Sequence, residues 1–137
     1  METTHDFSYG SYGDCAGVDF YGEPVNGFWT DCLSISTRFL NPLFLAALDR
    51  SVRSGRPAQR LVLDWINLEG WTEADRTVAL RPVEVEEWKH VFDGLSADDF
   101  DPKAAAAEPE KCLLCAKVIR DFVDSRSAGG KKVYVEM

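Results

Sequence analysis

The chain has 137 residues, of which 45% are hydrophobic and 12% aromatic, a composition that builds a hydrophobic core and excludes a wholly disordered chain. Its formal net charge of −8 repels phosphate backbones, which argues against direct binding of nucleic acid. No apolar run approaches the roughly 18 residues of a membrane span, and no basic segment followed by an apolar stretch marks a secretory signal. We therefore expect a soluble, cytoplasmic protein without membrane contact, or one secreted by a route that leaves no signal.

The N-terminal part predicts two short strands. Residues 18–21 favour a strand that ends at the turn-like sequence GEPVNG, since glycine, proline and asparagine mark turns. Residues 29–37 alternate between apolar and polar side chains, which predicts a second strand with Leu33 and Ile35 on one face.

A helix is predicted over residues 42–54. Asn41 is a favourable N-cap, Pro42 suits the first helical position, and Gly55 is a typical stop signal. Within this helix, three apolar side chains at helical spacing form one stripe: Leu45, Leu48 and Val52.

Residues 60–66 (RLVLDWI) alternate like a strand, with Leu61, Leu63 and Trp65 on one face, and residues 77–81 are expected to return antiparallel to it. A helix over 82–95, an exposed loop over 96–108 and a helix over 109–125 follow. Gly129 and Gly130 then turn the chain into a last strand over 131–137.

These elements predict a single α+β domain over residues 1–137. We expect a mostly antiparallel sheet of four to six short strands, together with about three helices. In the loop over 96–108, the clustered carboxylates of Asp98, Asp99 and Asp101 are interpreted as solvated, since their spacing lacks the EF-hand pattern of a calcium site.

The segment over residues 5–29 contains seven aromatic residues and no lysine or arginine. One interpretation is structural, with Phe20 and Trp29 in the core. The other is a protein interface, because exposed aromatics ringed by one sign of charge suit a basic partner. The residues of that interface are Tyr9, Tyr12, Tyr21, Asp14, Asp19 and Glu23.

Two further features extend the predicted interface. Trp71 lies between acidic residues in an expected loop, and Glu84, Glu86 and Glu87 open an acidic run over residues 84–101. Acidic surfaces accelerate association with basic-surfaced proteins, and more so at low salt. The sequence thus predicts a basic-surfaced protein partner, although these acids also serve ordinary solubility.

Cys112 and Cys115 form a CxxC pair, a spacing that suits zinc binding or redox chemistry. The same two cysteines share a helical stripe with Ile119 and Phe122, which favours a place in the core. We therefore predict no metal and no cofactor. Without a secretory signal, all four cysteines, including Cys15 and Cys32, are expected as free thiols.

Enzymatic function has weaker support. No catalytic motif such as GxSxG, HExxH, a P-loop or GxGxxG occurs. A small enzyme or ligand-binding domain would have to use Asp64, His90 or a cysteine, and we predict no catalytic residue.

In charge and size the chain is similar to small acidic antagonists, such as immunity proteins and phage inhibitors of host defence. We therefore expect a non-enzymatic antagonist that binds a basic, nucleic-acid-handling protein. The alternatives are the small enzyme, an accessory chaperone, or a zinc-stabilised interaction module. Homodimerisation through the aromatic segment would use the same residues as the predicted interface with a basic partner.

Overall fold

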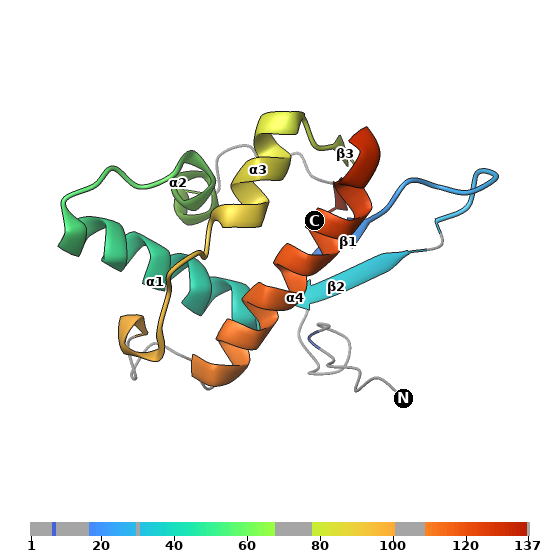
Figure 1. Cartoon of the computed structure of the whole chain (residues 1–137). Coiled ribbons are helices and arrows are strands. Elements are labelled where there is room, and N and C mark those ends of the chain that lie inside the picture. The colour runs from blue at the N-terminus through green and yellow to red at the C-terminus, as the bar shows by residue number, and fades with distance from the viewer. Residues whose placement is uncertain (1–6, 8–16, 30, 68–77, 101–108, 137) are drawn as a thin grey trace.

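The computed structural model describes residues 7, 17–29, 31–67, 78–100 and 109–136. In chain order its elements are β1 (Gly17–Tyr21), β2 (Cys32–Ser36), α1 (Thr37–Ser54), α2 (Arg60–Asn67), β3 (Val78–Ala79), α3 (Pro82–His90), the short 3-10 helix η1 (Ala97–Asp99), α4 (Pro109–Ser127), the 3-10 turn η2 (Ala128–Gly130) and β4 (Tyr134–Glu136). The strands form one sheet in the order β2-β1-β4-β3 with every pair antiparallel. The predicted α+β class and antiparallel sheet are confirmed (Figure 1).

The predicted numbers of elements need correction. Within the described part of the chain there are four α-helices rather than three. The predicted range of four to six strands is reached only if β3, with two residues, is counted. β3 pairs with β4, and so the expected pairing of residues 77–81 with residues 60–66 is wrong.

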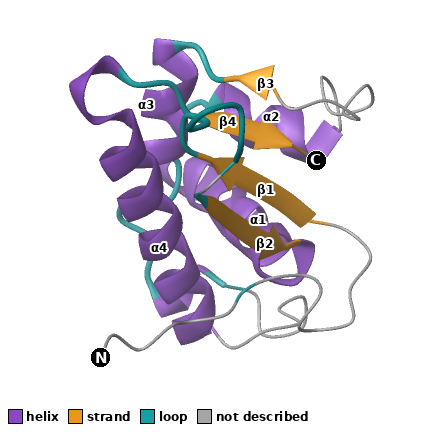
Figure 2. Ribbon diagram, turned by 90° about the vertical axis from the view of Figure 1, so that its right-hand side faces the viewer, coloured by secondary structure: helices purple, strands orange, loops and turns teal. Residues whose placement is uncertain are grey.

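The helices lie against one face of the sheet, as Figure 2 shows. Because side chains alternate along a strand, Val18 and Phe20 of β1 and Ile35 of β2 point toward the helices and are buried. Val133 and Val135 extend this buried surface at β4. The opposite face of the sheet carries Asp19 and Tyr21, which are only partly buried.

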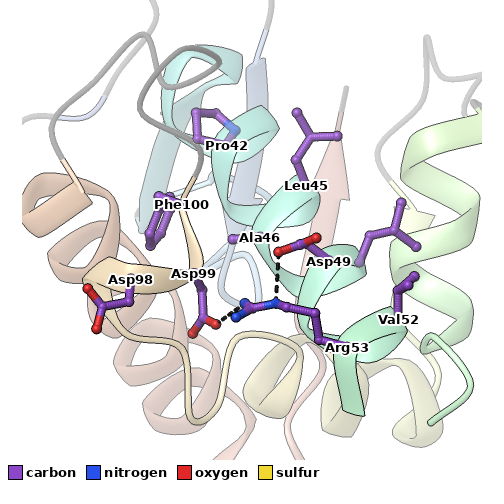
Figure 3. A pocket seen from close by; sticks show the side chains of 10 residues that line it. Pro42, Leu45, Ala46, Asp49, Val52, Arg53, Asp98, Asp99 and Phe100 are labelled. Atoms are coloured by element: carbon purple, nitrogen blue, oxygen red, sulfur yellow. Dashed lines mark hydrogen bonds and ion pairs between the residues drawn. The ribbon is translucent and has the colours of Figure 1, made fainter. Parts of the chain in front are cut away.

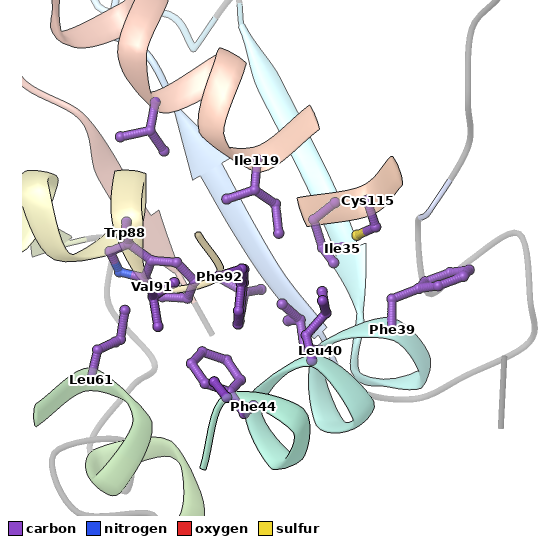
Figure 4. Close-up of a cluster of buried hydrophobic side chains, with 14 of the residues drawn as sticks. Ile35, Phe39, Leu40, Phe44, Leu61, Trp88, Val91, Phe92, Cys115 and Ile119 are labelled. Atoms are coloured by element: carbon purple, nitrogen blue, oxygen red, sulfur yellow. The ribbon is translucent and has the colours of Figure 1, made fainter. Parts of the chain in front are cut away.

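Aromatic rings join the layers of the core, which is shown in Figure 4. The ring of Phe44 stacks on Trp65 at 4.7 Å and meets Phe92 edge to face at 5.0 Å. Trp88 contacts Phe20 of the sheet at 4.9 Å. These contacts connect α1, α2, α3 and β1 in one hydrophobic cluster.

Helix α1 begins five residues earlier than predicted. Ser36, and not Asn41, is its N-cap, and the Ser36 side chain accepts a hydrogen bond from the Arg38 amide at 3.0 Å. Pro42 thus lies inside the helix. The Asn41 side chain instead accepts a hydrogen bond from the Trp65 indole at 2.9 Å, which ties α2 to α1.

The strand predicted over residues 60–66 is wrong, since these residues belong to the helix α2. Leu61 and Val62 are buried and Trp65 is half-buried, whereas Leu63 and Ile66 are exposed. Burial at i, i+1 and i+4 follows a helical face and not a strand face. The short apolar run fits the period of a strand as well as that of a helix, and packing against α1 favours the helix.

The predicted exposed loop over residues 96–108 is also partly wrong. Its described part contains η1, and both Asp99 and Phe100 are buried. Residues 101–108, which include Asp101, lie outside the described residues. Helix α3 ends at His90 rather than at residue 95, and a turn with Gly94 at φ 77° follows.

The predicted last helix and the glycine turn are confirmed, with α4 running to Ser127 and with Gly129 and Gly130 at positive φ. Among the described helices, none is long and apolar enough to cross a membrane.

Candidate protein-interaction site

The β1–β2 hairpin continues past its strands as an arm, which we define as residues 22–29 and 31. At its tip, Asn26 and Gly27 have φ values of 53° and 82°, the left-handed pair that a type I′ turn requires. Val25 and Phe28 close this turn through two backbone hydrogen bonds of 2.9 and 3.0 Å. The predicted turn in GEPVNG is therefore confirmed, and Figure 1 shows the arm projecting away from the helices.

Three contacts hold the base of the arm. The Gly22 amide donates to the Asp31 carbonyl at 3.3 Å, and the Arg126 guanidinium of α4 lies 3.4 Å from the Asp31 carboxylate. The Glu23 carboxylate accepts a hydrogen bond from the Lys132 amide at 2.9 Å. These contacts fix the direction in which the arm leaves the sheet.

Three large apolar side chains of the arm are exposed to solvent. The exposed fraction is 73% for Phe28, 56% for Val25 and 45% for Trp29. The expectation that Trp29 lies in the core is wrong, whereas Phe20 is fully buried as predicted. Neighbouring exposed apolar side chains on a soluble domain typically mark an interaction site.

An aromatic cluster connects the arm to the sheet. The Trp29 ring lies 4.9 Å from Tyr21 and 5.0 Å from Tyr134, measured between ring centroids. The Tyr21 hydroxyl donates a hydrogen bond of 3.4 Å to the Glu136 carboxylate. Burial, followed by the nearby charge of Asp19, raises the pKa of Tyr21, which keeps this hydroxyl protonated as a donor.

The sheet face beside the arm is acidic. We define the open face as the outward residues Asp19, Tyr21, Cys32, Ser34, Tyr134 and Glu136. The register places Asp19 directly opposite both Ser34 and Glu136, so two carboxylates are neighbours across the strands. The open face contains no lysine or arginine, although Lys131 and Lys132 lie exposed near the base of the arm.

The structure brings together three of the predicted interface residues. Asp19 and Tyr21 lie on the open face, and Glu23 lies at the base of the arm, where it also has the structural role described above. The predicted residues Tyr9, Tyr12, Asp14 and Trp71 lie outside the described residues.

The predicted acids of α3 do not join this surface. Phe20, on the inner face of β1, contacts Trp88 of α3, so α3 and the open face lie on opposite sides of the sheet. Glu84 accepts hydrogen bonds from the Arg81 amide at 2.9 Å and from its guanidinium at 3.1 Å. Glu86 pairs with Lys89 at 3.5 Å and His90 at 3.3 Å, while Glu87 lies on the same helix.

Sequence reasoning missed Phe28, Trp29 and Tyr134 as surface residues. The signal for the first two was present, because a valine and two aromatics flank the dipeptide Asn26-Gly27, the strongest short-range hairpin signal. Tyr134 had no such signal, since its position depends on pairing between β1 and β4, which are far apart in the chain.

The candidate catalytic residues are not assembled into a site. Asp64 forms an ion pair of 3.3 Å with Arg60 one turn earlier in α2. His90 is half-exposed and lies between the carboxylates of Asp93, at 2.7 Å, and Glu86, at 3.3 Å. Among the described residues, no cysteine or serine side chain is hydrogen-bonded to His90, so no nucleophile–base pair is formed there.

The CxxC pair is part of the core, as its helical stripe predicted. Cys112 and Cys115 are completely buried in α4. Burial raises the pKa of Cys112 to about 11 and raises that of Cys115 as well, the opposite of what an activated thiol needs. Among the described residues, no cluster of three metal-ligating side chains occurs, and Cys32, Cys112 and Cys115 are free thiols.

Comparison of the chain with known protein families, with curated proteins and with solved structures finds no match.

Proposed function

We propose that this chain is a non-enzymatic antagonist that binds a basic-surfaced protein through the arm and the open face. The observation that carries this proposal is the exposure of Phe28, at 73%, and of Trp29, at 45%, on a hairpin whose base is fixed by one ion pair and by hydrogen bonds. The proposal rests on physical features of the surface, since no relative supplies a function.

Rigidity of the arm supports a role in binding. A segment that must become ordered when it binds loses conformational entropy, and this loss reduces affinity. The type I′ turn, the contact of Asp31 with Arg126 and the Trp29 ring cluster order the arm in the free protein. The exposed aromatic side chains are thus available at a smaller entropic cost, as in binding hot spots.

Charge supports a basic partner. Asp19 and Glu136 lie side by side on the open face, and the whole chain has a net charge of −8. Proteins that handle nucleic acids present basic surfaces, so they are the class of target that best complements this face. An antagonist of such a protein would cover the surface that otherwise meets phosphate groups.

The enzyme alternative has less support. Asp64 is paired with Arg60, and the two CxxC thiols are buried with raised pKa values. A catalytic site brings a nucleophile, a base and an accessible cavity together. The described side chains place these groups on different elements of the fold.

The test is a capture experiment with matched variants, made in lysate of the source organism after nuclease treatment. The wild-type chain is compared with Phe28→Ser, and with Val83→Ser as the control, because Val83 is 57% exposed on α3. We expect one basic protein to be retained by the wild type and the control, released as salt rises, and lost from Phe28→Ser. The captured protein is then purified and its nucleic-acid activity is measured with and without the chain.

Retention of the same protein by Phe28→Ser would contradict a role of the arm. Undiminished activity of the captured protein in the saturated complex would show binding without antagonism.

A further inference from the structure

A second surface lies on the other side of the molecule from the arm. Helix α1 and the segment over residues 98–100 enclose a groove with a volume of about 640 Å³, which we call the α1 groove and which Figure 3 shows. Its apolar lining comes chiefly from Leu45, Leu48, Val52 and Phe100.

The apolar stripe of α1 supplies one wall of this groove. The core face of α1 is occupied by Phe39, Leu40, Leu43 and Phe44, all of which are buried. Of the predicted stripe, Leu48 is partly buried and packs against the core. Leu45 and Val52 lie outside that face, with exposed fractions of 45% and 71%. Helix α1 therefore has apolar side chains on two faces, of which the core covers only one.

The opposite wall is fixed by ion pairs. The buried Asp99 carboxylate accepts a hydrogen bond from the Ser96 amide at 2.8 Å and pairs with Arg50 at 3.3 Å and with Arg53. These bonds hold the residue that follows, Phe100, against α1, where it is 5% exposed. Contacts within the chain thus define both walls of the groove.

Charge at the groove indicates the chemistry of its occupant. The lining contains three aspartates, namely Asp49, Asp98 and Asp99, and one arginine, Arg53. Arg53 is already paired with Asp49 at 3.0 Å and with Asp99, and Asp98 has no ion pair within the described part of the chain. A second copy of this chain, with its net charge of −8, is a poor occupant.

We propose that the α1 groove binds an amphipathic helix with basic flanks, supplied by a partner protein. Leu45 and Val52 are seven residues apart, so the stripe extends about 10 Å along α1, a length that matches two turns of a bound helix. Helices enter such grooves through apolar side chains at positions i, i+3, i+4 and i+7. This inference goes beyond the proposed function and does not depend on the arm.

The test uses two synthetic peptides of identical leucine pattern, with lysine in one and glutamate in the other at the remaining positions. Binding is measured by calorimetry, and induced helix is measured by circular dichroism. We expect the lysine peptide to bind one site per chain with a gain of helix. The glutamate peptide should bind at least about tenfold more weakly.

Matched variants locate the site. Val52→Lys and Val83→Lys change the net charge equally, at two exposed positions on different helices. Val52→Lys should weaken binding of the lysine peptide by about tenfold or more, because it removes apolar contact and adds repulsion, whereas Val83→Lys should have little effect. Asp98→Asn, which leaves the apolar wall intact, should also weaken binding.

Absence of binding, equal affinity for both peptides, or equal losses in Val52→Lys and Val83→Lys would each overturn the proposal. Phe28→Ser separates the two surfaces, because it leaves the α1 groove unchanged. Loss of peptide binding in Phe28→Ser would place the peptide on the arm and would likewise overturn this inference, while leaving the arm's proposed role intact.

Discussion

Asp99 shows how one buried side chain joins two elements of the fold. Its carboxylate receives the Ser96 amide of its own turn and the guanidinium groups of Arg50 and Arg53 from α1. The Ser96 amide, together with the two arginines, lowers the pKa of Asp99. Folding therefore favours the ionised form of the Asp99 carboxyl group.

This shift predicts a loss of stability in acid. A lowered pKa in the folded state gives stability that is fully present above the ordinary aspartate pKa of about 4 and is lost as pH falls through the folded pKa. Asp99→Asn should reduce the free energy of unfolding at neutral pH by about 1–3 kcal/mol. It should also flatten the dependence of stability on pH below about 4, as measured by urea unfolding at a series of pH values.

The adjacent Asp98→Asn is the control, since Asp98 is exposed and makes no ion pair among the described residues. If the free energy of unfolding of Asp99→Asn depends on pH below about 4 as that of the wild type does, carboxylates other than Asp99 cause the loss of stability in acid.

The role of Asp99 could not be predicted from the sequence. The acidic run around it is typical of a solvated loop, and its partners Arg50 and Arg53 are 49 and 46 residues away. Burial of an aspartate depends on such distant partners, which a local pattern does not contain.

Among the elements, those with strong local signals were predicted well. Pro82 and Pro109 mark the starts of α3 and α4, because proline has a fixed helical φ and no amide hydrogen to leave unpaired in the first turn. The pair Asn26-Gly27 marks a turn whose positive φ values few other residues adopt. Helix α2 has no such signal, and its apolar residues fit both a strand and a helix. Its state is decided by the contact of Trp65 with Phe44 and Asn41, which sequence periodicity cannot specify.

The arm depends on the conformation of its turn. Gly27 has a φ of 82° with nothing within 4 Å of an added Cβ, so Gly27→Ala meets backbone strain rather than a steric clash. Strain of about 1–2 kcal/mol should open the turn more often. Hydrogen exchange at the Val25 and Phe28 amides should then accelerate about fivefold or more.

Gly55→Ala is the matched control, because Gly55 also has a positive φ and open space but caps α1. Unchanged exchange at Val25 and Phe28 in Gly27→Ala would show that the arm tolerates the substitution by another backbone conformation.

At the scale of the whole molecule, charge and contact should affect binding differently. Long-range attraction depends on the total charge and affects the association rate, whereas buried contacts control the dissociation rate. For the partner identified by capture, Glu86→Lys on α3 should slow association about two- to threefold at low salt and reduce its salt dependence. Phe28→Ser should instead accelerate dissociation, with both rates measured by surface plasmon resonance.

Lys117→Glu provides a control of opposite sign, since Lys117 is exposed on α4 and the change makes the chain more acidic. It should accelerate association. Equal association rates in all three proteins would contradict electrostatic steering.

The candidate site was only partly accessible to prediction. Asp19, Tyr21 and Glu23 were identified from the concentration of aromatics and acids, and the structure places them together. The acids of α3 share that composition but lie across the sheet, because composition carries no information about which face a segment takes. The exposure of Leu45 and Val52 on α1 was missed for the same reason.

The position of β4 between β1 and β3 has a consequence for synthesis on the ribosome. The β1–β2 hairpin can form as soon as it leaves the exit tunnel, but β1 gains its second neighbour only when residues 134–136 have also emerged. Until then the edge of β1 that pairs with β4 has unpaired backbone groups, which can bind any extended chain nearby. Closure of the sheet is therefore a late event of high contact order.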